Sequence, residues 1–134
     1  MKHVEVAAAL IFENGKVFAT RRGASPYPYL AHKFEFPGGK IEKGERGEDA
    51  IKRELKEELG LKVKVEGLYS VTGFTYPDFS ITLHLYECTM LSGFELKEHE
   101  EYAFFAPADL KPEDWAPADG EVIENIKRVF GGMA

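Results

Sequence analysis

The chain has 134 residues, 44% of them apolar, which suits a domain with a buried core and is unlike a disordered segment. No apolar run approaches the roughly 18 residues of a membrane helix, and the apolar N-terminal stretch lacks the basic flank and cleavage site of a signal peptide. The net charge of −6, without a basic block, argues against binding to nucleic-acid polymers, and the single Cys88 excludes an internal disulfide and fits a reducing cytoplasm.

The first third of the chain predicts a hairpin, a loop and a short strand. Residues 4–22 hold two apolar runs joined by Asn14-Gly15, a pair that favours the two-residue turn of a β-hairpin. Residues 23–33 contain two prolines and no clear period, which predicts a loop. Residues 34–40 (FEFPGGK) predict a short strand that runs into a Pro-Gly-Gly turn.

The rest of the chain predicts two helices and three strands. Residues 47–59 have helical spacing and end before Gly60, while residues 61–76 and 79–91 alternate as paired strands around Pro77-Asp78. Residues 101–106 predict another strand, and residues 120–130 predict a helix that packs on the sheet. Its apolar positions are Val122, Ile123, Ile126, Val129 and Phe130. We therefore expect one α+β domain over residues 1–134 with a mixed sheet, and we find no internal repeat.

The helix predicted at residues 47–59 crowds like charges. Glu54, Glu57 and Glu58 fall within five positions, beside the apolar stripe rather than opposite it. The stripe consists of Ile51, Leu55 and Leu59. One interpretation is a solvated helix with i,i+4 ion pairs, each worth about 0.3–0.5 kcal/mol. The other is a platform for a hard cation such as Mg²⁺, which neutralises carboxylates that would otherwise raise one another's pKa.

The spacing around this helix is more specific than its charge. From Gly39 the chain reads G-x5-E-x7-R-E-U-x-E-E-x-G-U, where U is aliphatic. The matching residues are Gly39, Glu45, Arg53, Glu54, Leu55, Glu57, Glu58, Gly60 and Leu61. Seven fixed letters give a chance on the order of 10⁻⁸ per starting point. The pattern resembles the complete Nudix box of the Nudix hydrolases.

The resemblance extends over nearly the whole chain and is greatest to the MutT-type nucleoside triphosphate pyrophosphohydrolases. The segments that carry it outside the box are TRRG, HKFEFPGGKIEKGE, YPDFSITLHLYE and DWAPADGEVIENIKR. The resemblance implies an αβα sandwich with a mixed central sheet. It also implies hydrolysis of a (deoxy)nucleoside triphosphate to the monophosphate and pyrophosphate with Mg²⁺, for which Mn²⁺ can substitute. The partner would be a small nucleotide, not a nucleic-acid polymer or a membrane, and the protein a cytoplasmic monomer or homodimer.

The resemblance also assigns roles within the box. The metal ligands would be the Gly38 carbonyl, Glu57 and Glu58 together with Glu54, which in MutT-type enzymes is proposed to orient or deprotonate the attacking water. Arg53 would fix the catalytic glutamate by a charge-assisted hydrogen bond. Glu45 would support the start of the helix.

The resemblance suggests roles for three further residues, of which Arg22 and Glu98 lie outside the box. Glu98 matches a glutamate of the subgroup that binds metal or acts as a base, with Glu100 and Glu101 as alternatives if the loop is shifted. Arg22 and Lys40 are plausible phosphate contacts, and these residue types suit an anionic substrate.

The base pocket is where the chain departs from the 8-oxoguanine-specific enzymes. Asp119 stands where those enzymes have asparagine, and an ionised aspartate only accepts hydrogen bonds, which suits the N4 amino group of cytosine. Phe79 replaces an arginine, and Asp78 matches a pocket residue. Phe36 either stacks on the base or packs in the core, and Asp119 either reads the base or caps the last helix.

Several functions therefore stay open at this stage. A cytidine nucleotide (CTP, dCTP or a modified dCTP) is the first substrate hypothesis. The second is 8-oxo-dGTP, because an oxidised purine adds an N7–H donor and a protonated aspartate can also donate. Nucleoside diphosphate sugars, ADP-ribose and capped RNA are less favoured, since the chain has no added domain and no basic tract. A non-catalytic nucleotide-binding module would show an eroded box, whereas here the box is intact.

Overall fold

The computed structural model describes residues 1–132, which divide into two compact units. The first consists of Met1–Ile11 with Pro37–Lys97, and the second of Phe12–Phe36 with the described residues from Glu98 onward. The division falls within strand β1 (Lys2–Glu13), which contributes residues to both units. Among residues 1–132, no helix has the length and apolarity needed to cross a membrane.

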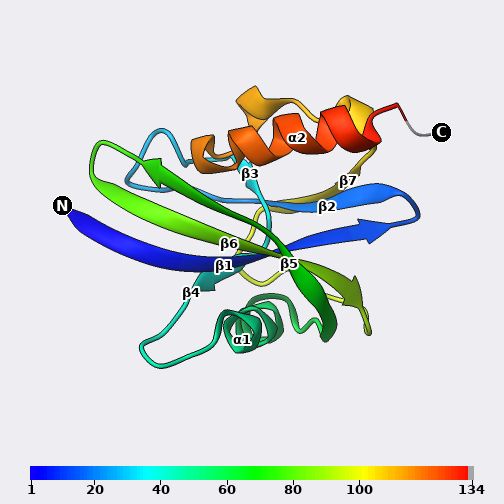
Figure 1. Ribbon diagram of the computed structural model, residues 1–134, viewed down its shortest axis with the longest axis horizontal. Coiled ribbons are helices and arrows are strands. Elements are labelled where there is room, and N and C mark those ends of the chain that lie inside the picture. The colour runs from blue at the N-terminus through cyan, green and yellow to red at the C-terminus, as the bar shows by residue number, and fades with distance from the viewer. Residues whose placement is uncertain (133–134) are drawn as a thin grey trace. The chain divides into compact units, whose positions relative to one another are not determined.

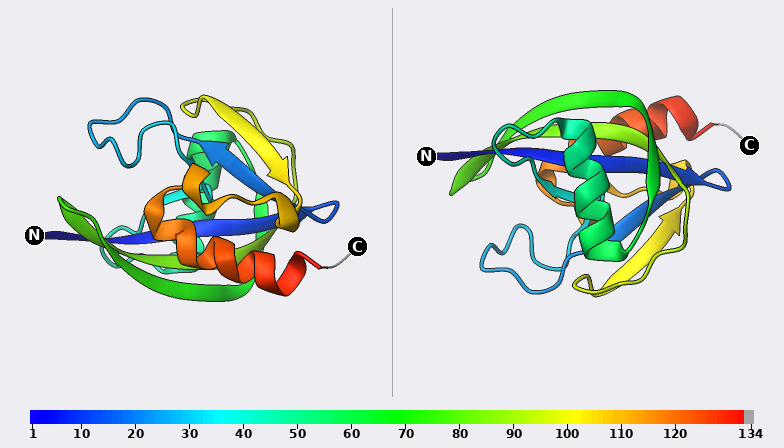
Figure 2. Two further views of the ribbon diagram at one scale, coloured as in Figure 1. Left: turned by 90° about the horizontal axis from the view of Figure 1, so that it is seen from above. Right: turned by 90° about the horizontal axis from the view of Figure 1, so that it is seen from below.

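The first unit is a mixed sheet with one helix (Figure 1). β1 pairs in parallel with β6 (Phe79–Met90) and antiparallel with β4 (Gly38–Lys40), while β5 (Val63–Thr75) is antiparallel to β6. Helix α1 (Gly47–Leu59) crosses these strands, as the right-hand view of Figure 2 shows. The predicted apolar stripe of α1, which consists of Ile51, Leu55 and Leu59, is fully buried, and so is Ala50. The helix and the two long strands are confirmed within two residues at each end.

One element of this unit differs from the prediction. Gly38–Lys40 is strand β4, paired with Val6–Ala8 of β1, and not the expected Pro-Gly-Gly turn. The chain bends at Pro37, whose carbonyl still accepts a hydrogen bond from the Ala9 amide at 2.9 Å. The glycines permit this pairing, because a Cβ on Gly38 would collide with the backbone of Ala7 and Ala8.

The second unit contains the antiparallel strands β2 (Lys16–Arg21), β3 (Phe34–Glu35) and β7 (Glu101–Phe105). β2 pairs with β7 along Val17–Arg21, with β3 at Thr20–Arg21, and with the last two residues of β1. The predicted hairpin is confirmed. Asn14 and Gly15 have φ values of 53° and 77°, the positive pair that a type I′ turn requires.

The second unit ends in helix α2 (Gly120–Phe130), preceded by three 3₁₀ turns that pack on it (Figure 2, left). These turns, η1 (Pro107–Asp109), η2 (Pro112–Asp114) and η3 (Pro117–Asp119), follow a short Pro-x-Asp pattern every five residues that the sequence analysis did not identify. Proline begins each turn, where its missing N–H is not needed. In α2, Val122, Ile123 and Ile126 are buried as predicted, but Val129 is 51% exposed.

Candidate active site

Helix α1 begins and ends where the box pattern requires. Gly60 adopts the left-handed conformation (φ 60°) and ends the helix, and the Leu61 amide donates back to the Leu55 carbonyl at 3.2 Å. No side chain caps the first turn. Instead, the loop before the helix is held by Glu45, whose Oε1 accepts the Glu42 amide at 3.0 Å.

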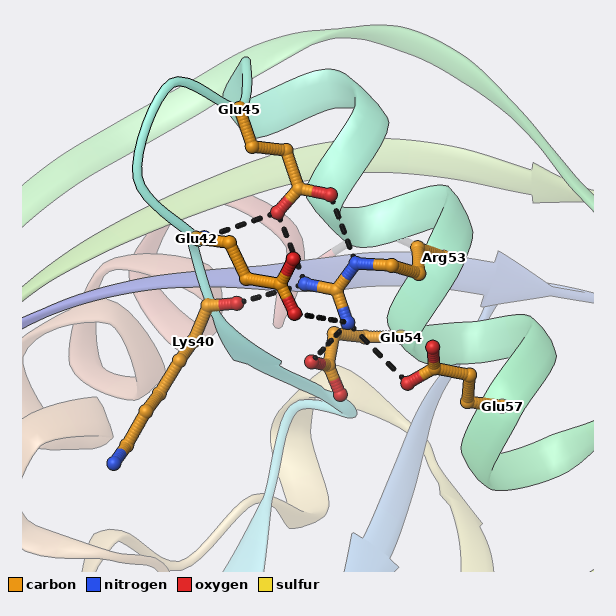
Figure 3. Close-up of polar contacts among 6 residues, drawn as sticks. All are labelled: Lys40, Glu42, Glu45, Arg53, Glu54 and Glu57. Atoms are coloured by element: carbon orange, nitrogen blue, oxygen red, sulfur yellow. Dashed lines mark hydrogen bonds and ion pairs between the residues drawn. The ribbon is translucent and has the colours of Figure 1, made fainter.

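Arg53 is the centre of the polar contacts on this helix (Figure 3). Its Nε and Nη2 donate to the two carboxylate oxygens of Glu45 at 2.8 and 2.9 Å, and Nη2 also donates to the Lys40 carbonyl at 3.0 Å. Its Nη1 donates to Glu54 Oε1 at 2.8 Å and to Glu57 Oε2 at 3.3 Å. One guanidinium thus connects the box loop, the end of β4 and two of the three clustered glutamates, and all five of its N–H groups have an acceptor.

The paired guanidinium fixes the protonation state of Glu45. Its hydrogen bonds to Arg53, followed by the bond from the Glu42 amide, lower the pKa of Glu45 to about 2. The same bonds to Glu45, and then to Glu54, raise the pKa of Arg53 further above its ordinary value. Glu45 is therefore a fixed anion throughout the neutral range, which keeps Arg53 in one orientation.

Gly39 lets β4 approach this network. A Cβ on Gly39 would collide with the carboxylate of Glu54, so only glycine leaves room for that side chain. The side chain of Glu54 is only 14% exposed, whereas that of Glu57 is 59% exposed. Glu54 is thus confined between Arg53 and β4, as a group that must hold one orientation should be.

The three glutamates supply the right atoms for a hard cation. Carboxylate oxygens and the Gly38 carbonyl are ligands of the kind that Mg²⁺ prefers. As they stand, however, no group of three or more His, Cys, Asp or Glu side chains within residues 1–132 is arranged to hold a metal ion. Glu57 accepts the longest hydrogen bond of the Arg53 network, and its side chain is more exposed than those of Glu45 and Glu54. The donor set fits a cation if Glu57 exchanges this bond for the metal.

A second group of predicted residues lies around Glu35 in the second unit. Arg22 Nη2 donates to Glu35 Oε2 at 2.7 Å, and His99 Nε2 lies 3.6 Å from Glu35 Oε1. Asp119 is 5% exposed, and burial raises its pKa well above the ordinary value. The negative charge of Glu35 raises that pKa further, whereas Arg22 lowers it. The neutral carboxyl form of Asp119 is therefore favoured, and a neutral carboxyl both donates and accepts.

The structure also bears on whether Asp119 caps helix α2. It occupies the N-cap position of α2, but its side chain makes no capping hydrogen bond. Burial also raises its pKa, which shifts Asp119 away from the ionised, acceptor-only form and towards the neutral carboxyl. Asp119 is buried next to Glu35 and Arg22 without capping α2, so reading the base stays the other role predicted for it.

The remaining predicted residues have varied settings. Phe36 is 3% exposed and packs on Trp115 with ring centroids 4.8 Å apart, which is the core-packing alternative, and its stacking on a base stays a prediction. Asp78 lies in the turn between β5 and β6.

In Figure 3 the side chain of Lys40 points away from Arg53, so its backbone carbonyl and not its ammonium joins the network. Cys88 is buried as expected, and burial raises its thiol pKa to about 12.

The structure distinguishes Glu98 from its two alternatives. Glu100 lies 2.9 Å from Arg21 and 2.8 Å from His32, and Glu101 lies 3.2 Å from Arg21. Glu98 is exposed and makes no ion pair or hydrogen bond through its side chain with residues 1–132. Its carboxylate is thus available to a ligand, while the other two are engaged.

Sequence reasoning missed Glu35 and the roles of Glu42 and the Lys40 carbonyl. Glu35 had a visible signal, since it is an acidic residue between two phenylalanines in a short strand. Its side chain is 19% exposed and contacts both Arg22 and His99. Glu42, 3.8 Å from Arg53, and the Lys40 carbonyl had no such signal, because backbone acceptors and loop conformations are not encoded in spacing.

Comparison with known proteins decides the family. The family model of the NUDIX domain matches residues 1–126. The chain belongs to the Nudix family. It is an enzyme of the Nudix hydrolase class, and the fold prediction of an α+β structure with a mixed sheet is confirmed.

Relatives of this Nudix hydrolase have two different names. It is 37% identical over 131 residues to a protein of Escherichia coli (strain K12) named 8-oxo-dGTP diphosphatase, with 96% of this chain and all of that protein covered. It is 32% identical over 125 residues to the CTP pyrophosphohydrolase of the same organism, covering 92% and 91% of the two chains.

Solved structures agree on the fold. The solution structure of the E. coli ORF135 protein matches with a TM-score of 0.81 and 30% identity, covering 100% of this chain and 96% of that one. A MutT NUDIX hydrolase from Burkholderia pseudomallei matches with a TM-score of 0.80 over 96% and 99% of the chains, at 21% identity, and so supports the fold alone.

Proposed function

We propose that this Nudix hydrolase cleaves (deoxy)nucleoside triphosphates to the monophosphate and pyrophosphate with Mg²⁺, for which Mn²⁺ can substitute. The observation that carries the proposal is the Arg53 network, which confines Glu54 beside β4 while Glu57 stays exposed on the same helix face. If α1 were only a solvated surface helix with ion pairs, the facing strand would not need a glycine at position 39. Here a Cβ on Gly39 would collide with the carboxylate of Glu54.

The mechanism divides the work among residues of the chain. Glu57, Glu58 and the Gly38 carbonyl would hold Mg²⁺, together with Glu54 and Glu98. When bound, the cation neutralises the phosphate charge and lowers the pKa of coordinated water. Glu54 holds and deprotonates the attacking water, and Arg53 keeps the Glu54 carboxylate in line. Phosphoryl transfer depends mainly on alignment and charge neutralisation, so these positioning tasks are the larger part of catalysis.

For the base, the first candidate is a cytidine nucleotide. Cytosine presents the N4 amino donor and, beside it, the N3 acceptor. A neutral Asp119 can accept a hydrogen bond from the N4 amino group and donate one to N3. Asp119 therefore suits cytosine in its neutral form as well as in its ionised form. Phe79 in place of an arginine, and the 32% identical relative named CTP pyrophosphohydrolase, support the same candidate.

The second candidate is 8-oxo-dGTP, and two observations favour it. A neutral Asp119 behaves as asparagine does, accepting from the added N7–H of the oxidised base and donating to O6. The relative that is 37% identical over 96% of this chain is named 8-oxo-dGTP diphosphatase. Unmodified guanine offers two acceptors on that edge and would lose one of the bonds.

A substrate panel tests the proposal and separates the candidates. The panel contains CTP, dCTP, 5-methyl-dCTP, dGTP, 8-oxo-dGTP, ATP, UTP and ADP-ribose with Mg²⁺, and it compares released pyrophosphate with released phosphate. We expect pyrophosphate as the product and the highest kcat/KM for cytidine nucleotides. A preference for 8-oxo-dGTP would keep the reaction and replace the base. Failure to hydrolyse any triphosphate would overturn the proposed reaction.

The remaining features of the proposal concern the protein as a whole. We propose one Nudix domain, since the family match runs through residues of both units. The partners would be small nucleotides and not nucleic-acid polymers or membranes, in keeping with the net charge of −6. A cytoplasmic location and a monomeric or homodimeric state complete the proposal. The state is tested by light scattering.

A further inference from the structure

Glu42 lies at the edge of the Arg53 network without a hydrogen bond to it. Its Oε1 is 3.8 Å from Arg53 Nη1, beyond hydrogen-bond distance, and its side chain is 69% exposed. Figure 3 shows this carboxylate next to the same nitrogen that donates to Glu54 and Glu57. Glu42 is thus an acceptor within the first unit that stands close to Arg53 and is only loosely engaged.

The backbone of Glu42 is already fixed. Its amide donates to Glu45 Oε1, and its carbonyl accepts the Glu45 amide, both at 3.0 Å. The preceding Ile41 amide donates to the Glu5 carbonyl of β1 at 2.9 Å. A charge-assisted hydrogen bond of about 2.8 Å to Nη1 would require the carboxylate to move by about 1 Å. Rotation of the Glu42 side chain alone can provide this movement, because the loop backbone is held in place.

Arg53 has no spare acceptor if Glu57 leaves the network. The two N–H groups of Nη1 donate to Glu54 Oε1 at 2.8 Å and to Glu57 Oε2 at 3.3 Å. When Glu57 turns to a cation, one of these N–H groups loses its acceptor, although the Arg53 side chain is only 25% exposed. The cation also brings positive charge towards the guanidinium, which repels it. Both effects favour the approach of another carboxylate to Nη1.

We propose that Glu42 is a positioning residue that replaces Glu57 at Arg53 Nη1 when Glu57 turns to Mg²⁺. The inference rests on the proposed function for the metal role of Glu57, whereas the place of Glu42 beside Nη1 is independent of that role. The exchange keeps all five N–H groups of Arg53 paired, so the guanidinium holds Glu54 in the same way with and without the cation. Glu42 therefore stabilises the metal-bound form more than the metal-free form.

The experiment is a calorimetric titration with Mg²⁺ alone, without nucleotide, of the parent, Glu42→Ala, Glu57→Gln and Glu48→Ala. Glu48 is the matched control, because it is another exposed glutamate near the start of α1 and its ion pair, at 3.4 Å, is with Arg46 and not with Arg53. We expect Glu42→Ala to weaken Mg²⁺ binding about two- to fivefold, the range of an exposed ion pair, and Glu48→Ala to bind as the parent does. Without Mg²⁺, Glu42→Ala should unfold at the same urea concentration as the parent.

Two measurements separate action through Arg53 from direct binding of the cation by Glu42. In an Arg53→Gln background, Glu42→Ala should weaken Mg²⁺ binding by less than about 1.5-fold, because the guanidinium that it pairs with is absent. In crystals of the parent grown with Mg²⁺, Glu42 Oε1 should lie about 2.8 Å from Arg53 Nη1, with Glu57 turned to the cation. The crystals decide the question if Arg53→Gln does not fold.

The outcomes that overturn the exchange differ from those that overturn the function. Parental Mg²⁺ affinity in Glu42→Ala, an equal loss in Glu48→Ala, or a water in place of Glu42 at Nη1 would each overturn the exchange while the reaction stands. A full loss that persists in the Arg53→Gln background would assign Glu42 to the cation instead of to Arg53. Unchanged Mg²⁺ affinity in Glu57→Gln would remove the exchange together with the metal role of Glu57. Absence of triphosphate hydrolysis in the parent would overturn the proposed function, and the Mg²⁺ titrations would still decide the exchange.

Discussion

Replacement of Arg53 by lysine is the sharpest test of the box network. Lysine keeps the charge but has three donors on one nitrogen and no planar fork. Arg53 makes five hydrogen bonds, two of them side by side to Glu45. A lysine can keep at most three of the five and cannot keep the paired geometry, so Glu45 and Glu54 are no longer held by a single rigid group.

The magnitude follows from the hydrogen bonds that lysine cannot make. At a net 0.5–1.5 kcal/mol each, two missing hydrogen bonds correspond to about 1–3 kcal/mol. The Arg53 side chain is 25% exposed, and solvent screening favours the lower part of that range, so we expect the unfolding free energy to fall by about 1–2 kcal/mol. Without the fixed Glu54 orientation, kcat should fall on the order of 10²-fold.

Urea unfolding gives the stability and triphosphate turnover gives kcat, and NMR titration of the Glu45 carboxyl reports the contact itself. In the parent the pKa of Glu45 is about 2, against an ordinary 4.5, and in Arg53→Lys it should return towards the ordinary value. Because the folded pKa is lowered, Glu45 stabilises the fold above about pH 4.5, and this contribution is lost as the pH falls towards 2. The variant should lose less stability over that window.

Two results would refute the reasoning. One is an Arg53→Lys protein whose kcat stays within about threefold of the parent, which would mean that Glu54 does not depend on the fork. The other is a low Glu45 pKa that persists in the variant, which would show that the Glu42 amide alone holds the carboxylate. Lys56→Arg, on the exposed side of the same helix, is the matched control for a swap of basic residues and should change neither quantity.

Three further predictions concern charge, metal and packing. Burial raises the pKa of Asp119, so its stabilising contribution is complete below pH 3.8 and is lost as the pH rises through the folded value. The stability of Asp119→Asn, measured in thermal scans, should therefore increase relative to the parent as the pH rises above 3.8, and a difference that is constant with pH would contradict this. Glu57→Gln should raise the Mg²⁺ concentration for half-maximal turnover at least about tenfold, and unchanged turnover would remove its metal role. The unfolding free energy should change by less than about 0.5 kcal/mol, since the side chain is 59% exposed. Gly47→Ala should destabilise by about 1–2 kcal/mol in urea, because its Cβ would collide with the Tyr86 hydroxyl; in a Tyr86→Ala background the same change should stabilise, and the same sign in both would show that Tyr86 is not the cause.

Local sequence signals determined most of the secondary structure. Asn14-Gly15 produced the hairpin because few other pairs accept two positive φ values, and Gly60 ended α1 for the same reason. The period of Ile51, Leu55 and Leu59 was sufficient to orient that helix, since the burial of one face is a local property of a helical repeat. The box spacing led to the family, which the match to residues 1–126 confirmed.

Tertiary structure decided what spacing does not encode. Gly38–Lys40 became a strand because β1 lies beside it, and no local signal announces a partner that is about 30 residues away. The Lys40 carbonyl joined the Arg53 network, a contact that the sequence did not suggest, because backbone acceptors are oriented only by the fold. Burial beside Glu35 moved Asp119 towards its neutral form, and a pKa depends on surroundings assembled from β3, η3 and the end of β2. Residue identity alone determined which groups could do the chemistry, but their orientation and protonation required the folded chain.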